Sequence, residues 1–160
     1  MTKHFNTVVI GGGCLGCACA FFFIRQLGRQ QNKVAIIEKK VLGAGLSSRH
    51  SAIVRSANAS AMAARMAKIA TRQWKTLNNL WGVDIPFEQP GAIWIAENSQ
   101  TIATNKWQLL EKAMQQENIA LEMISRNEVT DLCNGAIRVD PDEIYFYEPD
   151  VLQLDSSEIL

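Results

Sequence analysis

The sequence has no excess of charge of either sign, since its 160 residues include sixteen basic and sixteen acidic side chains. A neutral chain creates no global field that attracts DNA, RNA or an anionic membrane, so we expect a small molecule as the partner. The longest apolar run, residues 14–24, is shorter than the roughly 20 residues that a membrane-spanning helix needs. Neither a targeting segment nor an internal repeat is visible.

Cysteine is also scarce, and its distribution excludes a disulfide framework. Three of the four cysteines, Cys14, Cys17 and Cys19, lie in one predicted helix start, and only Cys133 lies elsewhere. This pattern indicates a reducing, cytoplasmic setting. No group of His and Cys residues has the spacing of a zinc site, so no metal centre is predicted.

The hydrophobic residues, which make up 48% of the chain, instead predict alternating strands and helices. Residues 7–10 and 34–37 have the β-branched pattern of buried parallel strands. The helix expected between them, residues 15–27, is apolar nearly all round, which predicts that it is buried. Further helices are expected at 59–81, 102–117 and 125–132, with strands at 92–96, 120–124 and, at a sheet edge, 144–147. The fold class is therefore predicted to be α/β.

Between the first strand and the first helix, residues 11–16 have the sequence GGGCLG, which matches the pattern G-x-G-x-x-G. Gly11 allows a sharp turn, Gly13 allows the backbone to approach a pyrophosphate, and Gly16 allows the helix to pack close to the strands. The free N–H groups and the dipole of the helix then favour a phosphate. The strand-turn-helix-strand context predicts a dinucleotide site rather than a turn that only packs a helix onto a sheet.

Glu38 ends the second strand and follows Gly16 by 22 residues. This is close to the spacing of about 20 at which a carboxylate accepts hydrogen bonds from the ribose hydroxyls. A carboxylate there also repels a 2′-phosphate and so disfavours NADP. The first forty residues therefore predict a site for the ADP half of NAD or FAD.

Cys14 and Cys17 also match the C-x-x-C pattern of thiol redox sites, in which a helix start stabilises a thiolate. The same positions belong to the nucleotide turn, where small side chains suit close packing. We interpret both cysteines as small apolar residues.

Residues 43–56, GAGLSSRHSAIVRS, form a long irregular segment of a kind that is usually functional. Together with the glycine turn and Glu38, this segment resembles the amine-oxidising flavoproteins of the D-amino acid oxidase superfamily, notably the sarcosine oxidase β-subunit and dimethylglycine dehydrogenase group. The resemblance covers residues 5–60 well and continues loosely through the later chain. It implies FAD as the cofactor, with residues 47–51 running along it toward the flavin ring. The cofactor site thus expected comprises Gly11, Gly13, Cys14, Leu15, Gly16, Glu38, Lys39, Ser47, Ser48, Arg49, His50 and Ser51.

The resemblance also implies roles for Arg55 and His50. Arg55 matches the arginine that monomeric sarcosine oxidases use for the substrate carboxylate, and a guanidinium pairs well with a carboxylate. A solvated charge or a structural ion pair is the alternative. His50 matches a histidine that carries a covalent link to FAD in dimethylglycine and sarcosine dehydrogenases, but Arg49 precedes it where those enzymes have Trp. A covalent link, a non-covalent flavin contact and an ordinary loop position all stay open.

The function that the resemblance implies is FAD-dependent oxidation of a secondary or tertiary amine, such as an N-methyl amino acid, to an imine that water hydrolyses. Residues 1–84 are expected to form the N-terminal part of the FAD-binding domain and residues 85–160 part of a substrate domain. Family members are more than twice as long, so we expect an N-terminal fragment with open apolar sheet faces. Partner subunits are expected if the protein is β-subunit-like. A non-catalytic nucleotide-binding remnant and an NAD-dependent dehydrogenase are the alternatives.

Overall fold

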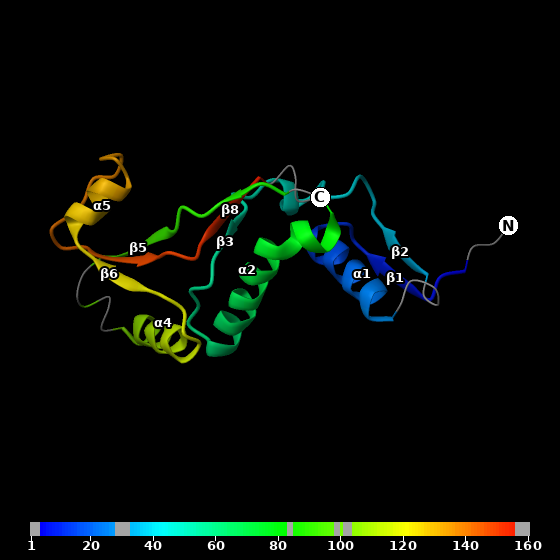
Figure 1. Ribbon diagram of the computed structural model, residues 1–160, viewed down its shortest axis with the longest axis horizontal. Helices are drawn as coiled ribbons and strands as arrows, with labels where there is room; N and C mark the ends of the chain where they lie inside the picture. The colour runs from blue at the N-terminus through cyan, green and yellow to red at the C-terminus, as the bar shows by residue number, and fades with distance from the viewer. Residues whose placement is uncertain (1–3, 28–32, 83–84, 98–99, 101–103, 156–160) are drawn as a thin grey trace. The chain divides into compact units, whose positions relative to one another are not determined.

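The computed structural model describes residues 4–27, 33–82, 85–97, 100 and 104–155 of the chain. The chain divides into a first unit, Met1–Ala52 with Leu154–Leu160, and a second unit, Ile53–Gln153. Figure 1 shows the helices and strands of each unit. The domains predicted from the sequence, residues 1–84 and 85–160, are parts of the complete family fold. That division stays a prediction.

The first unit contains the strand-helix-strand arrangement that the sequence predicts. Strand β1 (Thr7–Ile10) and strand β2 (Val34–Ile37) pair in parallel, with Thr7 opposite Val34 and Ile10 opposite Ile37. Helix α1 (Cys14–Leu27) connects them and begins one residue before the predicted start. The Rossmann-type unit is therefore confirmed. The predicted turn after this helix falls mainly on residues 28–32, which lie outside the described residues.

Apolar side chains of the first unit remain open to solvent, as expected for a sheet of few strands. The described sheet has two strands, and the side chain of Ile10 is 86% exposed. The expectation that α1 is buried against the sheet is wrong for part of the helix: Ala20 is buried, but Phe22 and Phe23 are exposed. Two strands can cover only one side of a helix, and this explains the difference.

The second unit contains a three-stranded sheet in the order β5-β7-β6, in which both pairings are antiparallel. Its strands are β5 (Ala92–Ala96), β6 (Glu122–Ile124) and β7 (Ile144–Glu148). The prediction of an edge strand at residues 144–147 is wrong, because β7 has a partner on each side. Tyr145 and Phe146 of β7 are accordingly buried.

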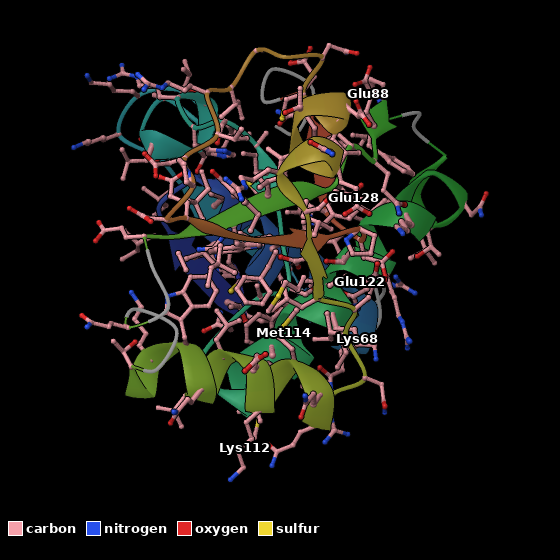
Figure 2. The ribbon with its side chains drawn as sticks, turned by 90° about the vertical axis from the view of Figure 1, so that its left-hand side faces the viewer. Lys68, Glu88, Lys112, Met114, Glu122 and Glu128 are labelled. Carbon is pink, nitrogen blue, oxygen red and sulfur yellow. The ribbon has the colours of Figure 1, made fainter. Side chains whose placement is uncertain are left out.

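Helices cover this sheet and form the core of the second unit. Helix α2 (Ala61–Trp81) packs with helix α4 (Asn105–Gln116), where Ala64 and Met114 share one buried cluster. Met114 points from α4 toward the sheet in Figure 2, whereas Lys112 of the same helix points away from it. Trp107 of α4 stacks on Phe146 of β7, with ring centroids 5.2 Å apart. Helix α4 thus has an apolar face toward the sheet and a charged face away from it, as an amphipathic helix does.

The remaining elements of the second unit are short. Helix α5 (Arg126–Leu132) begins with the predicted cap: the Ser125 hydroxyl accepts the N–H of Glu128, and the Glu128 carboxylate accepts the N–H of Ser125. The Ser125 hydroxyl, which donates to this carboxylate, lowers the pKa of Glu128. A second sheet has the order β3-β8-β4, formed by β3 (Ile53–Val54), β8 (Leu152–Leu154) and β4 (Phe87–Glu88). In the part of the chain that the structure describes, no helix is long and apolar enough to cross a membrane.

Candidate functional site

The glycine turn of the first unit has a geometry that requires glycine at two of its positions. Gly11 has a φ of +104°, a conformation that side chains with a Cβ rarely adopt. At Gly16, a Cβ would collide with the carbonyl group of Gly11. Helix α1 can therefore approach the end of β1 only because residue 16 has no side chain.

The start of α1 offers backbone N–H groups that the protein does not use. The first helical hydrogen bond runs from the N–H of Cys17 to the carbonyl oxygen of Gly13. Among the described residues, the N–H groups of Gly13, Leu15 and Gly16 have no hydrogen-bond acceptor. Unpaired donors at the positive end of a helix dipole are the groups that bind a phosphate. The turn thus fits the pyrophosphate of a dinucleotide.

The carboxylate of Glu38 binds the glycine turn from the end of β2. Its Oε2 atom accepts the N–H of Gly12 at 2.8 Å, and its Oε1 atom accepts the N–H of Lys40 at 3.0 Å. These two donors, the N–H of Gly12 above all, lower the pKa of Glu38. Each carboxylate oxygen has a second lone pair, so both can still accept a hydrogen bond from a ribose hydroxyl. The neighbouring side chain of Lys39 is exposed.

The Gly/Ser-rich segment folds back onto the same turn. The N–H of Gly43 donates to the carbonyl oxygen of Gly12 at 2.8 Å, and the Ser47 hydroxyl accepts the N–H of Cys14 at 3.0 Å. Ser48 lies in a short 3-10 helix, Leu46–Ser48, and its hydroxyl donates to the carbonyl oxygen of Gly43. Three segments that are distant in sequence, the turn, the end of β2 and this segment, are therefore joined by hydrogen bonds.

The residues that follow are exposed at the surface of the first unit. Arg49, His50 and Ser51 are all exposed. The Nδ1 atom of His50 accepts the N–H of Ala52 at 2.8 Å, and Ala52 has a φ of +52°. Because Nδ1 acts as an acceptor, the proton of a neutral His50 is on Nε2, and Nε2 has no partner among the described residues. Contacts of these side chains with a cofactor stay a prediction.

The cysteines at the helix start do not have the properties of a redox pair. Burial, and secondarily the neighbouring Cys17, raises the pKa of the Cys14 thiol. A reactive thiol at a helix start needs the opposite shift. The Cys17 thiol lies 3.7 Å from the carbonyl oxygen of Gly12, toward which it donates. These observations favour the interpretation of both as small packing residues.

Arg55, the predicted carboxylate-binding residue, belongs to the second unit. Its Nη1 atom donates to the carbonyl oxygen of Ala57 at 3.0 Å, and its guanidinium lies over the Trp94 ring, 4.7 Å from the ring centroid. In the described part of the chain it forms no salt bridge with an acidic side chain. Arg55 is exposed, and among the described residues its guanidinium has these two contacts and no acidic partner.

One residue near Arg55, Glu148, could not be found from the sequence. Glu148 is completely buried, and its carboxylate accepts the N–H groups of Ser56 and Ala57 and the indole N–H of Trp94. The available signal in the sequence is a single acidic residue that directly follows the apolar run 144–147. Because such a residue also ends many exposed strands, its burial could not be predicted.

Comparisons with known proteins agree with this geometry. The family model described as FAD dependent oxidoreductase matches residues 6–158. A curated relative, 4-methylaminobutanoate oxidase (formaldehyde-forming) of Paenarthrobacter nicotinovorans, is 26% identical over 99 residues, which are 62% of this chain and 12% of the relative.

Solved structures of related proteins share the fold across almost the whole chain. L-proline dehydrogenase from P. horikoshii has a TM-score of 0.84 at 18% identity, over 99% of this chain and 40% of that one. L-amino acid deaminase from Proteus vulgaris has a TM-score of 0.81 at 18% identity, over 99% and 36%. Glycine oxidase from Geobacillus kaustophilus has a TM-score of 0.75 at 18% identity, over 99% and 42%.

The chain therefore spans about two fifths of the length of these solved structures and an eighth of the curated relative. The family match covers nearly every residue, and the glycine turn with Glu38 has the shape and donors that a dinucleotide requires. This chain belongs to the family of FAD-dependent oxidoreductases, with FAD as its cofactor.

Proposed function

We propose that the protein oxidises a secondary or tertiary amine, an N-methyl amino acid or a related amino acid, to an imine that water then hydrolyses. The observation that carries this proposal is the joining of the glycine turn, Glu38 and the Gly/Ser-rich segment into one region of the first unit. The names of the similar proteins support the substrate class, since 4-methylaminobutanoate, glycine and L-proline each combine an amine with a carboxylate.

In this proposal, three groups of residues bind the pyrophosphate, the ribose and the flavin of the cofactor. The unpaired N–H groups of Gly13, Leu15 and Gly16 bind the pyrophosphate, and Glu38 accepts hydrogen bonds from the ribose. Residues 47–51 extend toward the flavin. Bound FAD supplies the oxidation by accepting a hydride equivalent from the carbon next to the amine nitrogen.

Arg55 provides the substrate carboxylate with a cationic partner. The guanidinium lies over the Trp94 ring, 4.7 Å from its centroid, which is a cation–π contact. The described contacts use one of its five N–H donors, the one that reaches Ala57. The remaining donors can form a bidentate pair with a carboxylate.

His50 contacts the flavin through Nε2 in this proposal, because Nδ1 is held by the N–H of Ala52. Acid denaturation of the wild-type protein and of His50→Ala distinguishes a contact from a covalent link. Flavin released equally from both proteins is the expected result. Flavin that stays on the wild-type polypeptide alone shows that the link is covalent.

The proposed function is tested with the purified protein and its absorption spectrum. We expect a yellow protein whose flavin band is bleached, in the absence of oxygen, by N-methylglycine and not by N-methylethylamine, which lacks a carboxylate. A colourless protein that does not bind FAD identifies a nucleotide-binding remnant. A nicotinamide-dependent absorbance change without flavin identifies an NAD-dependent dehydrogenase, for which Glu38 is equally suitable.

The cellular location that we propose is the cytoplasm. The four cysteines are all free, although Cys14 and Cys17 lie near each other at the start of α1. Free thiols are typical of a reducing compartment.

A further inference from the structure

A buried carboxylate lies behind the predicted substrate arginine. Glu148 at the end of β7 has no exposed surface, yet no cation pairs with it among the described residues. Its Oε1 atom accepts the N–H groups of Ser56 at 2.6 Å and Ala57 at 3.0 Å. Its Oε2 atom accepts the indole Nε1–H of Trp94 at 3.0 Å. Burying a carboxylate is costly, and these three donors offset that cost.

The same three donors belong to residues that follow Arg55 in sequence or contact its guanidinium. Ser56 and Ala57 are the two residues that follow Arg55, and the carbonyl oxygen of Ala57 accepts a hydrogen bond from the guanidinium. Trp94 on β5 carries the guanidinium over its ring. Glu148 therefore holds both the backbone segment that follows the arginine and the aromatic ring under its side chain.

We propose that Glu148 is a positioning residue for Arg55, which it holds so that the edge of the guanidinium faces a substrate carboxylate. This inference rests on the proposed function, because it assigns to Arg55 the binding of that carboxylate. Only a carboxylate satisfies the geometry fully: one oxygen accepts the two backbone N–H groups and the other accepts the indole N–H. A glutamine has a single acceptor oxygen and cannot serve both sides.

The ordering of Arg55 matters because a long, flexible side chain loses rotamer entropy when it binds a ligand. A guanidinium that is already fixed loses less entropy, so it binds a carboxylate more tightly. A guanidinium that is misplaced by about 1 Å loses the bidentate geometry as well. Glu148→Gln is therefore expected to weaken carboxylate binding in particular. Because residue 148 is completely buried, it acts through Arg55 and not by contact with the ligand.

The test compares two ligands that differ in their carboxyl group. N-methylglycine and N-methylglycinamide are titrated into the flavin-loaded protein, and the ratio of their dissociation constants measures carboxylate recognition. We expect Glu148→Gln to weaken N-methylglycine binding by on the order of tenfold, with little change for the amide, because coupled contacts have this magnitude. A residue with only a structural role would weaken both ligands equally, and that result overturns the proposal.

The chain offers matched controls for this experiment. Glu122→Gln on β6 and Glu88→Gln on β4 make the same chemical change at exposed positions of the second unit, both labelled in Figure 2. Both controls are expected to leave the ratio unchanged.

In NMR spectra, the indole N–H signal of Trp94 should shift and exchange faster with solvent in Glu148→Gln only. An unshifted, protected signal in that variant contradicts the role of Glu148.

If Glu148→Gln does not fold, Trp94→Phe tests the same connection. It removes the indole N–H that bonds to Glu148 and retains an aromatic face. The dissociation constant of N-methylglycine is again expected to rise relative to that of N-methylglycinamide, and an unchanged ratio contradicts the proposal.

Arg55→Met separates the failure of this inference from the failure of the proposed function. Loss of carboxylate recognition in Arg55→Met, together with an unchanged ratio in Glu148→Gln, refutes the role of Glu148 alone. Recognition that survives in Arg55→Met refutes the substrate role of Arg55, and with it the role of Glu148, whereas the proposed amine oxidation fails only if no amine reduces the flavin. Loss of carboxylate recognition in Arg55→Met and in Glu148→Gln supports the roles proposed for Arg55 and for Glu148.

Discussion

The Oε2 atom of Glu38 accepts a hydrogen bond from the backbone N–H of Gly12 at 2.8 Å, across 26 residues of sequence. This bond joins the end of β2 to the turn after β1, so the carboxylate that is expected to bind the ribose also helps to shape the turn that is expected to bind the pyrophosphate. Cofactor binding and local stability are therefore coupled at Glu38.

Glu38 should make the stability of the first unit dependent on pH. Its pKa is lowered in the folded state, so its contribution is fully present above the unfolded value of about 4.3 and is lost as the pH falls through the folded value. Glu38→Gln should therefore be most destabilising near pH 7 and progressively less so in acid. Urea unfolding of both proteins across this range measures the difference. A difference that is constant with pH would contradict the role of the ionised carboxylate, and Glu122→Gln serves as the control.

Gly16→Ala should prevent the close packing of α1 on the end of β1. A Cβ at residue 16 collides with the backbone of Gly11, which cannot move without disturbing the turn. We expect a loss of stability of about 3 kcal/mol, measured by urea unfolding, and a loss of FAD binding. Cys19→Ala, at an exposed position of the same helix, should change stability by less than about 0.5 kcal/mol. Normal FAD affinity in Gly16→Ala would show that the observed packing is not required for binding.

Ser47→Ala should weaken the attachment of the segment 43–51 to the glycine turn, although the bond from Gly43 to Gly12 remains. It removes the acceptor for the N–H of Cys14, and an unpaired, part-buried N–H costs about 1 kcal/mol. Amide hydrogen exchange at Cys14 should become faster, and FAD should bind more weakly. Ser48→Ala is the matched control, since its hydroxyl bonds to Gly43 and not to Cys14. If the Cys14 amide exchanges equally slowly in the wild type, Ser47→Ala and Ser48→Ala, the hydrogen bond from Cys14 to Ser47 does not protect it.

Cys14 should react slowly with thiol reagents. Burial raises the pKa of its thiol, so little of the reactive thiolate is present at neutral pH. Alkylation followed by mass spectrometry should label the exposed Cys19 faster than Cys14. Faster labelling of Cys14, or a Cys14–Cys17 disulfide under mild oxidation, would revive the redox interpretation of the C-x-x-C pattern.

Elements whose signals are local could be predicted well from the sequence. The strands at residues 7–10 and 34–37 and the cap at Ser125 match the structure, because residues near one another in the chain specify them. The placement of residues 144–147 at a sheet edge is wrong, because strand neighbours come from distant parts of the chain. The burial expected for α1 is wrong for a similar reason: it depends on how many strands are available to cover the helix.

By itself, the sequence determined the glycine turn and its partner Glu38. A positive φ and a close backbone approach require glycine whatever surrounds them, and the distance from Gly16 to Glu38 is fixed by one helix and one strand. Only the tertiary structure decided the surroundings of Arg55. The bonds from Glu148 to Ser56 and to Trp94 span 92 and 54 residues, and no local pattern marks such partners. The pairing of β5 with β7 brings Trp94 to Glu148, and it helps to turn an ordinary strand-ending glutamate into a buried residue beside the arginine.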